Sequence, residues 1–227
     1  MTGRPKLAKR NASGSVRFVG RTIWGMGKGA FDMSRVLVAC EESQIVCKAF
    51  RARGHEAYSC DILSTSGNNP EWHIQGDVVP LLGKDWDLIV AFPPCVHLSV
   101  SGARHFEEKR KDGRQQQAID FFMLFTNLKC SKVAIENSVG IMSTFYRKSD
   151  QIIQPHQFGH PESKKTCLWL KGLPLLTPTN VLDPPASGRW DNQTPSGQNK
   201  LGPSAERSRI RSKTYTGIAD AMSKTWG

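Results

Sequence analysis

Short apolar segments alternate with segments of helical spacing from residue 35 onward. Residues 35–39 and 56–60 read as strands, and residues 43–53 between them have the spacing of a helix that ends at Gly54. Further strands are predicted at residues 88–92, 132–135 and 167–170, and further helices at 115–129 and from about Gly217. Strands that alternate with helices predict an α/β fold with a mainly parallel, doubly wound sheet, in which ligands bind at the carboxyl ends of the strands.

The chain's 227 residues and 38% apolar content suit one hydrophobic core. We expect this core in a single domain at residues 34–227. Residues 1–33 are rich in Gly, Lys and Arg without periodicity, which predicts a flexible basic extension. Residues 171–213 are rich in Pro, Gly, Ser and Asn, which predicts a long basic surface loop rather than a second domain.

The formal net charge of +11 is concentrated in two segments. Residues 1–32 hold seven Lys or Arg and one acid, and residues 187–213 hold six Lys or Arg and two acids. The middle of the chain is nearly neutral. Two basic flanks around a neutral core favour a polyanionic partner, most simply nucleic acid, although basic ends are also common as plain solvated segments.

The six cysteines form no CxxC pair and no cluster of zinc-ligand spacing, which indicates separate reduced thiols in an intracellular protein. No segment approaches the roughly 20 apolar residues that a membrane span needs. The N-terminus lacks the apolar middle region of a secretory signal. We therefore expect a soluble cytoplasmic protein, in the host cytoplasm if it is viral, without membrane contact and without a metal.

The segment DLIVAFPPCVHLSVS at residues 87–101 places a cysteine directly after a short apolar strand and two prolines. Because proline continues neither a sheet ladder nor a helix, Cys95 is expected on a rigid turn at the carboxyl end of the strand. A cysteine in that place is a candidate nucleophile. The alternative is a structural turn with a buried thiol.

Three acids also fall at predicted strand ends, namely Asp61, Asp77 and Glu136. A carboxylate that follows the second strand of a βαβ unit is well placed to accept two hydrogen bonds from a ribose. Each acid taken singly is better explained as an ordinary solvated or capping residue. Together they indicate a nucleoside-type cofactor beside the Cys95 nucleophile.

Three motifs together resemble the DNA (cytosine-5)-methyltransferase family in its short, bacteriophage-like form with a reduced target recognition region. They are FPPC at 92–95, IENSVG at 135–140 and HIQGDV at 73–78, and the resemblance covers roughly residues 35–170 with a weaker echo at 214–222. The family places its Pro-Cys motif about 40 residues before its Glu-Asn-Val motif, as Cys95 and Glu136 stand here. The resemblance implies a Rossmann-like methyltransferase fold that uses S-adenosylmethionine, and a role in DNA methylation such as a restriction-modification system.

By this resemblance, Cys95, Glu136 and Asn137 are catalytic. The Cys95 thiolate would add to cytosine C6, which makes C5 nucleophilic toward a methyl group. Glu136 would supply a proton or hydrogen bond at N3 if partial burial raises its pKa, and Asn137 would orient that carboxyl. The target base must be flipped out of a duplex or already single stranded.

The resemblance also implies the contacts to S-adenosylmethionine, with Asp61 on the ribose and Asp77 on the adenine amino group. The implied cofactor residues are Cys40, Glu41, Ser43, Asp61, Asp77, Pro93 and Thr216. The chain reads ACEESQ at 39–44, where the family has a Gly-rich loop that lets the backbone approach the ligand. Glu41 and Ser43 are candidates for the methionine ammonium, and the alternative for Ser43 is the N-cap of the following helix.

The residues assigned to DNA are Pro94, His97, Ser99, Arg104, Lys164, Lys165, Arg207, Arg209 and Arg211. Lys164 and Lys165 stand where the family tends to have arginines, and lysine does not form the bidentate fork of arginine. Only about 43 residues replace the usual recognition domain, so we expect a relaxed site, a single-stranded substrate or a protein partner that supplies specificity. No feature indicates the oligomeric state.

Two other functions stay open. One is a weak or inactive relative that binds nucleic acid or acts as a decoy, since the cofactor loop is altered and the arginines are missing. The other is the same chemistry on RNA or on a free cytosine nucleotide, which the small recognition region permits.

Overall fold

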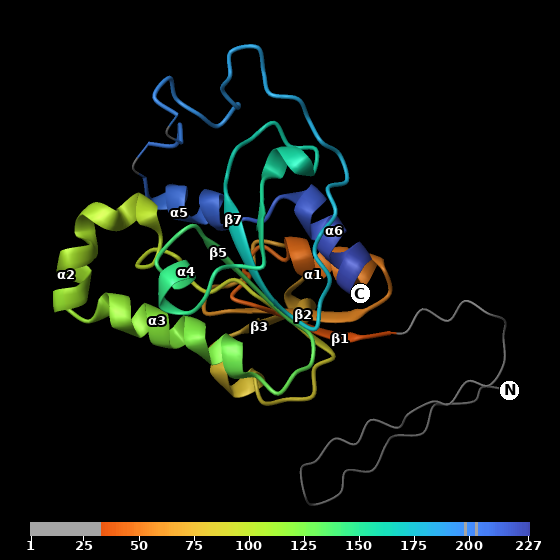
Figure 1. Ribbon diagram of the computed structural model, residues 1–227. Coiled ribbons are helices and arrows are strands. Elements are labelled where there is room, and N and C mark those ends of the chain that lie inside the picture. Colours follow the sequence, from red (N-terminus) through yellow and green to blue (C-terminus); the bar gives the residue numbers. More distant parts are fainter. Residues whose placement is uncertain (1–32, 198, 203) are drawn as a thin grey trace, which may run out of the picture. The chain divides into compact units, whose positions relative to one another are not determined.

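Seven strands form one sheet, in the spatial order β3-β2-β1-β4-β5-β7-β6 (Figure 1). The computed structural model describes residues 33–197, 199–202 and 204–227, so the predicted extension at 1–33 lies almost entirely outside the described residues. The strands are β1 (Arg35–Ala39), β2 (Glu56–Asp61), β3 (His73–Gln75), β4 (Leu88–Ala91), β5 (Val133–Ser138), β6 (Gln151–Ile153) and β7 (Thr166–Lys171). Residues from Asp32 to Gly227 form one compact unit.

The first five strands run parallel, and β7 runs antiparallel to both β5 and β6. The chain leaves β1 toward β2 and β3, then returns to the other side of β1 with β4 and β5. This order, with one reversed strand between β5 and β6, is that of the Rossmann-like methyltransferase fold. The expected fold class is confirmed.

Helices cover both faces of the sheet. They are α1 (Ile45–Ala52), α2 (Phe106–Lys111), α3 (Arg114–Leu124), α4 (Met142–Phe145), α5 (Ala205–Ser212) and α6 (Thr216–Trp226). Short 3₁₀ helices are η1 (Pro70–Trp72), η2 (Val79–Leu81), η3 (Val100–His105), η4 (Phe125–Asn127) and η5 (Pro155–Gln157). Helices α1 and α6 lie side by side against one face, and α3 and α4 lie against the other (Figure 1).

The alternation of side chains along β1 divides the core into two clusters. Val36 and Val38 pack with the α1 and α6 side chains, whereas Leu37 and Ala39 pack with those of α3, α4 and η4. All four are fully buried, as the central position of β1 requires. At about 1.5–3 kcal/mol for each large apolar side chain buried, this packing fixes the strand ends where the site lies.

Several features of the fold differ from the sequence prediction. Helix α1 begins at Ile45 rather than at residue 43. Strand β5 continues to Ser138, because β7 pairs with it along its whole length. The interval 171–213 contains helix α5, whose N-cap Ser204 accepts a hydrogen bond from the Arg207 amide at 3.1 Å. The short strands β3 and β6 were not predicted, since three residues carry too little periodicity.

Candidate active site

The carboxyl ends of β1 and β4 lie at the switch point of the sheet, where the strand order reverses and where doubly wound folds have their ligand crevice. A hydrogen bond of 2.9 Å from the Phe92 amide to the Ala39 carbonyl joins the two strand ends. Cys40 follows one strand directly, and the Pro-Cys turn follows the other. Doubly wound sheets bind their ligands at this point.

A tight turn holds Cys95 in place. The amides of Leu98 and Ser99 both donate to the Cys95 carbonyl, at 3.0 and 2.9 Å. Pro93 is buried, Pro94 is exposed, and Cys95 itself is half-buried. The structure therefore agrees with the predicted turn after the strand, and the thiol is not sealed in the core.

The pairing of β4 with β5 brings Glu136 to the same edge. Ala91 lies opposite Ile135, so Glu136 stands level with the start of the Pro-Cys turn. The Asn137 side-chain amide donates to the Pro93 carbonyl at 2.8 Å, and Asn137 is 1% exposed. Two segments that lie 41 residues apart in the sequence are thus joined by a buried hydrogen bond, with Asn137 fastened to the turn.

The environment of Glu136 favours its protonated form. Burial raises the pKa of the Glu136 carboxyl above its ordinary value, although the Lys164 ammonium and the Thr166 hydroxyl both act to lower it. This direction is the one expected of a general acid. A half-buried carboxyl that keeps its proton can donate a hydrogen bond to a ring nitrogen.

The loops that follow β4 and β5 are bonded to each other. The Val100 amide donates to the Val139 carbonyl at 3.1 Å, and the Ile141 amide donates to the Leu98 carbonyl at 3.0 Å. Gly140 lies where any added Cβ would clash with the Leu98 carbonyl oxygen. The close approach of the two loops therefore requires glycine at this position.

Two acids gather near Cys40 on the other side of the crevice. Burial raises the pKa of the Cys40 thiol to about 12, and the negative charges of Asp61 and Asp77 add to this effect. Cys40 itself has a left-handed backbone, with φ 60°. The ends of β1 and β2 and the segment after β3 therefore form one electronegative corner around Cys40.

Both acids at this corner keep carboxylate oxygens available for a ligand. One oxygen of Asp61 accepts from the Leu63 amide at 2.9 Å, and one oxygen of Asp77 accepts from the Val79 amide at 3.0 Å. Within the described residues, the second oxygen of each carboxylate has no protein partner. The Ile62 side chain beside Asp61 is 74% exposed and leaves an apolar surface next to the two acids.

The loop at 39–44 is organised by Glu41. Its carboxylate oxygens accept hydrogen bonds from the Val46 and Cys47 amides, at 2.7 and 3.1 Å, and cap the first turn of α1. Gln44 precedes the helix with φ 60° and makes no side-chain cap, so the alternative that Ser43 is the N-cap is wrong. In a Rossmann-like fold these amides would otherwise receive a ligand anion. We therefore leave Glu41 out of the proposed cofactor contacts.

The free energy of unfolding should fall as the pH rises, because the Glu41 carboxyl loses its proton. Burial raises the pKa of this carboxyl from 4.5 to about 7, so the folded state holds the proton more tightly than the unfolded state. The stabilisation is complete below pH 4.5 and is lost as the pH passes 7. We expect the cost of Glu41→Gln to be roughly 2 kcal/mol smaller at pH 8 than at pH 4.5, because glutamine does not ionise. Urea unfolding at both pH values measures this difference, with exposed Glu71→Gln as control. Equal costs at both pH values would contradict it.

Helix α5 carries the three arginines assigned to DNA. They differ in how far their guanidinium groups are already bonded to other groups of the protein. The Arg209 guanidinium pairs with Glu42 and Glu206, both at 3.6 Å, and Arg207 donates to the Leu201 carbonyl. The side chain of Arg211 is exposed, and its backbone carbonyl accepts from the Lys164 ammonium at 2.9 Å. Helix α5 is thus tied to both the altered cofactor loop and the segment before β7.

The remaining predicted residues lie at three places. His97 and Ser99 belong to the turn after Cys95, and exposed Arg104 contacts His105 in η3. Lys165 is exposed beside Lys164. Thr216 begins α6 and lies 3.4 Å from the His160 ring, so within the described residues its contact is with that loop rather than with the Cys40 corner.

Sequence reasoning missed three features of the site. Ile62 and Val79 are exposed apolar residues next to the two acids, and exposed apolar side chains at strand ends would have been the signal. Thr166, opposite Ser138 on β7, affects Glu136 through a pairing that no local pattern reveals. Buried Lys109 reads as a solvated charge within FEEKRK.

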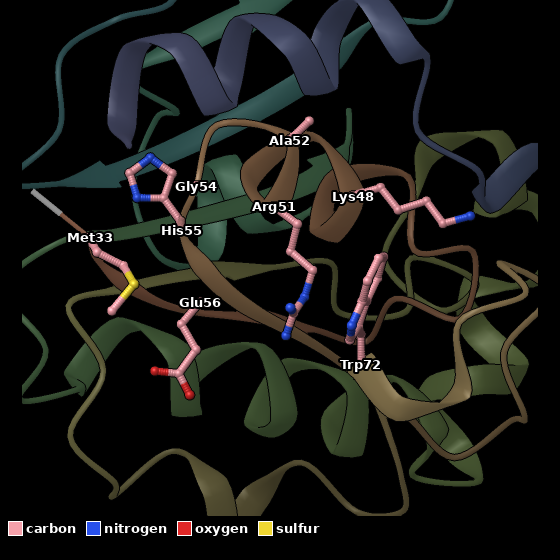
Figure 2. A pocket seen from close by; sticks show the side chains of 8 residues that line it. All are labelled: Met33, Lys48, Arg51, Ala52, Gly54, His55, Glu56 and Trp72. Atoms are coloured by element: carbon pink, nitrogen blue, oxygen red, sulfur yellow. The ribbon is translucent and has the colours of Figure 1, made fainter. Parts of the chain in front are cut away.

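A separate pocket of about 560 Å³ lies near the amino end of β2, away from the carboxyl ends of the strands (Figure 2). Its lining includes Lys48, Arg51 and Trp72, and the Arg51 guanidinium lies over the Trp72 ring at 4.5 Å. Arg51 also lies over the Tyr58 ring at 5.0 Å, so both neighbours occupy its faces. This pocket is distinct from the crevice that carries Cys95.

No three His, Cys, Asp or Glu side chains gather as metal ligands in the described part of the chain. None of the helices described is both long and apolar enough to cross a membrane.

Comparison with known proteins gives distant structural similarity. No protein-family model and no curated protein sequence matches the chain. Similar solved structures include a prophage-encoded E. coli protein assigned as a DNA modification methyltransferase, with 17% identity and a TM-score of 0.44. Another is the Entamoeba histolytica methyltransferase EhMeth, with 14% identity and a TM-score of 0.47. The matches cover 68% and 67% of this chain, but only 53% and 58% of those chains. Likeness this low adds nothing to the fold assignment, which rests on strand order.

Proposed function

We propose that the protein is an S-adenosylmethionine-dependent methyltransferase that acts on C5 of cytosine in DNA. The observation that carries the proposal is the joining of the Cys95 turn to strand β5 through Asn137, which brings the nucleophile and Glu136 to one strand edge. The acids at Asp61 and Asp77 stand at the same edge, on the cofactor side of the crevice.

Each of these residues has a role in the proposed reaction. Cys95 attacks C6 of a flipped cytosine as the thiolate and forms a C–S bond. Protonated Glu136 gives its proton to N3, which neutralises the negative charge that moves into the ring and leaves Glu136 as the carboxylate. S-adenosylmethionine would be held by Asp61 and Asp77, and it would supply the methyl group to C5 and leave as S-adenosylhomocysteine. The N3 proton then returns to the Glu136 carboxylate and water removes the C5 proton. The Cys95 thiolate departs as the C–S bond breaks, which restores the aromatic ring.

DNA contact is assigned to the exposed cations around the crevice. Arg211 and Lys165 have exposed side chains, as does Arg104 in η3. Arg209 is paired with two acids and would have to exchange Glu42 or Glu206 for a phosphate. Phosphate contacts of this kind give affinity without sequence readout, in keeping with a relaxed target site.

A second candidate function is nucleic-acid binding without methyl transfer. The observation in its favour is the Glu41 cap on α1, which occupies backbone amides that a Rossmann-like fold often uses for a ligand. A protein that binds DNA through its basic segments but does not bind S-adenosylmethionine would fit this arrangement.

Transfer of a tritiated methyl group from S-adenosylmethionine separates these functions. The substrates are duplex DNA, single-stranded DNA, RNA and dCMP, and nucleoside analysis identifies the product. Label in 5-methyldeoxycytidine from DNA supports the proposal. Label only from RNA or dCMP overturns the choice of substrate. No label, together with DNA binding and no binding of S-adenosylmethionine in equilibrium dialysis, supports the second function.

A further inference from the structure

Helix α2 contains one lysine whose charge is not balanced by an acid. Lys109 is 7% exposed, and its ammonium has no carboxylate within 4.0 Å among the described residues. The nearby acids are engaged elsewhere, because Glu107 pairs with Lys111 at 2.8 Å and Glu108 with Arg114 at 2.6 Å. Asp112 also pairs with Arg114. A buried ammonium without a counter-charge is costly, and therefore needs another explanation.

The Lys109 ammonium lies inside the loop that carries the candidate nucleophile. It donates to the Val96 carbonyl at 2.7 Å, and Val96 follows Cys95 directly. A Cβ added to Gly102 would lie 3.2 Å from the same nitrogen, so the loop passes the ammonium twice. The Phe106 ring lies 5.9 Å from it and adds a weak cation–π contact.

A neighbouring side chain holds the next carbonyl. Gln115 at the start of α3 is 5% exposed and donates from its amide to the His97 carbonyl at 3.2 Å. Two consecutive peptide groups after Cys95 are therefore oriented by buried donors from α2 and α3. These bonds restrain the backbone immediately after Cys95.

We propose that Lys109 is a positioning residue that holds the loop at 95–102 in the conformation from which Cys95 reacts. The inference deepens the proposed function, and its catalytic consequence rests on that function. The strong ammonium–carbonyl bond acts on the peptide next to the nucleophile, so its loss would let the loop open and spoil the alignment of the thiol with its target.

The test compares Lys109→Met with Lys111→Met in the full-length protein. Both variants remove an ammonium from α2, but Lys111 is exposed and bonded only to Glu107. Hydrogen exchange is followed at the amides of Leu98, Ser99 and Gly102, which are bonded within the loop. We expect exchange at least about 10-fold faster in Lys109→Met, and kcat about 10- to 100-fold lower with KM changed less than about 3-fold. Lys111→Met should leave both unchanged.

Unchanged exchange and unchanged kcat in a folded Lys109→Met variant would overturn the proposal. If that variant does not fold, Lys109→Ala replaces it, because it also removes the donor to the Val96 carbonyl. Exchange in Lys109→Ala equal to that of the unaltered protein would then overturn the proposal. The exchange readout does not need methyl transfer, so an enzyme that methylates nothing can still show whether Lys109 holds the loop.

Discussion

Replacing Cys95 with alanine is expected to lower methyl transfer to cytosine by at least about 10⁴-fold, because no other group replaces a covalent nucleophile. Without addition at C6, C5 is too poor a nucleophile to accept the methyl group. The fold should tolerate the change, since the half-buried thiol fills no tight core position. Tritium incorporation into duplex DNA measures the loss, and retained DNA binding in the variant shows that the site is intact.

Cys130→Ala is the matched control. Cys130 is also a half-buried free cysteine, but its sulfur donates to the Trp86 carbonyl and lies before the start of β5, at the other end of that strand. DNA that contains 5-fluorocytosine adds a direct test, because it traps a covalent adduct with Cys95 in the unaltered protein and in Cys130→Ala. An adduct or normal methyl transfer in Cys95→Ala would exclude the proposed nucleophile.

Local sequence patterns were sufficient for the features that depend on one strand end. Leu88 to Ala91 is apolar throughout and two prolines follow it, so the strand, its end and the turn that bears Cys95 were all predictable. The same holds for Asp61, which ends β2. In a doubly wound sheet these ends converge, so the sequence predicted that Cys95 and Asp61 stand at the same edge of the sheet.

Features that depend on pairing between distant segments were not predictable in this way. β5 was predicted to end at residue 135, because Glu136 and Asn137 are polar and interrupt the apolar pattern. In the structure they continue the strand, since the reversed strand β7 supplies their backbone partners. The bond from Asn137 to Pro93 depends on the same register, which no single segment specifies.

The loop at 39–44 shows why residue type alone did not assign a role. Glu41 was expected to face a ligand ammonium, as an acid in a cofactor loop, yet its carboxylate bonds to amides of its own chain. The first amides of α1, like those of any helix, need an acceptor outside the helix, and Glu41 supplies it. Glu42, in turn, reaches Arg209 of α5, more than 160 residues away. Whether an acid in this loop contacts a ligand or the protein itself depends on the direction of its side chain. Amino-acid composition does not specify that direction.

Replacing Glu136 with glutamine is expected to lower kcat for cytosine methylation by about 10²- to 10³-fold, the usual contribution of a general acid. Burial raises the pKa of the Glu136 carboxyl, and the active form is the protonated one. Activity that depends on this proton is complete below that pKa and falls as the pH rises through it. The glutamine side chain does not titrate, so the low remaining activity should lack this decrease at high pH.

The pH profile separates loss of the proton from loss of structure. Thr166→Val removes the hydroxyl that favours the charged form of Glu136 while leaving the carboxyl in place. Because that hydroxyl lowers the Glu136 pKa, its removal should shift the decrease in activity to higher pH, whereas Glu136→Gln should abolish the decrease. A glutamine variant with the same pH profile as the unaltered protein would assign the proton to another group, and Glu136 would then only pack beside the target base.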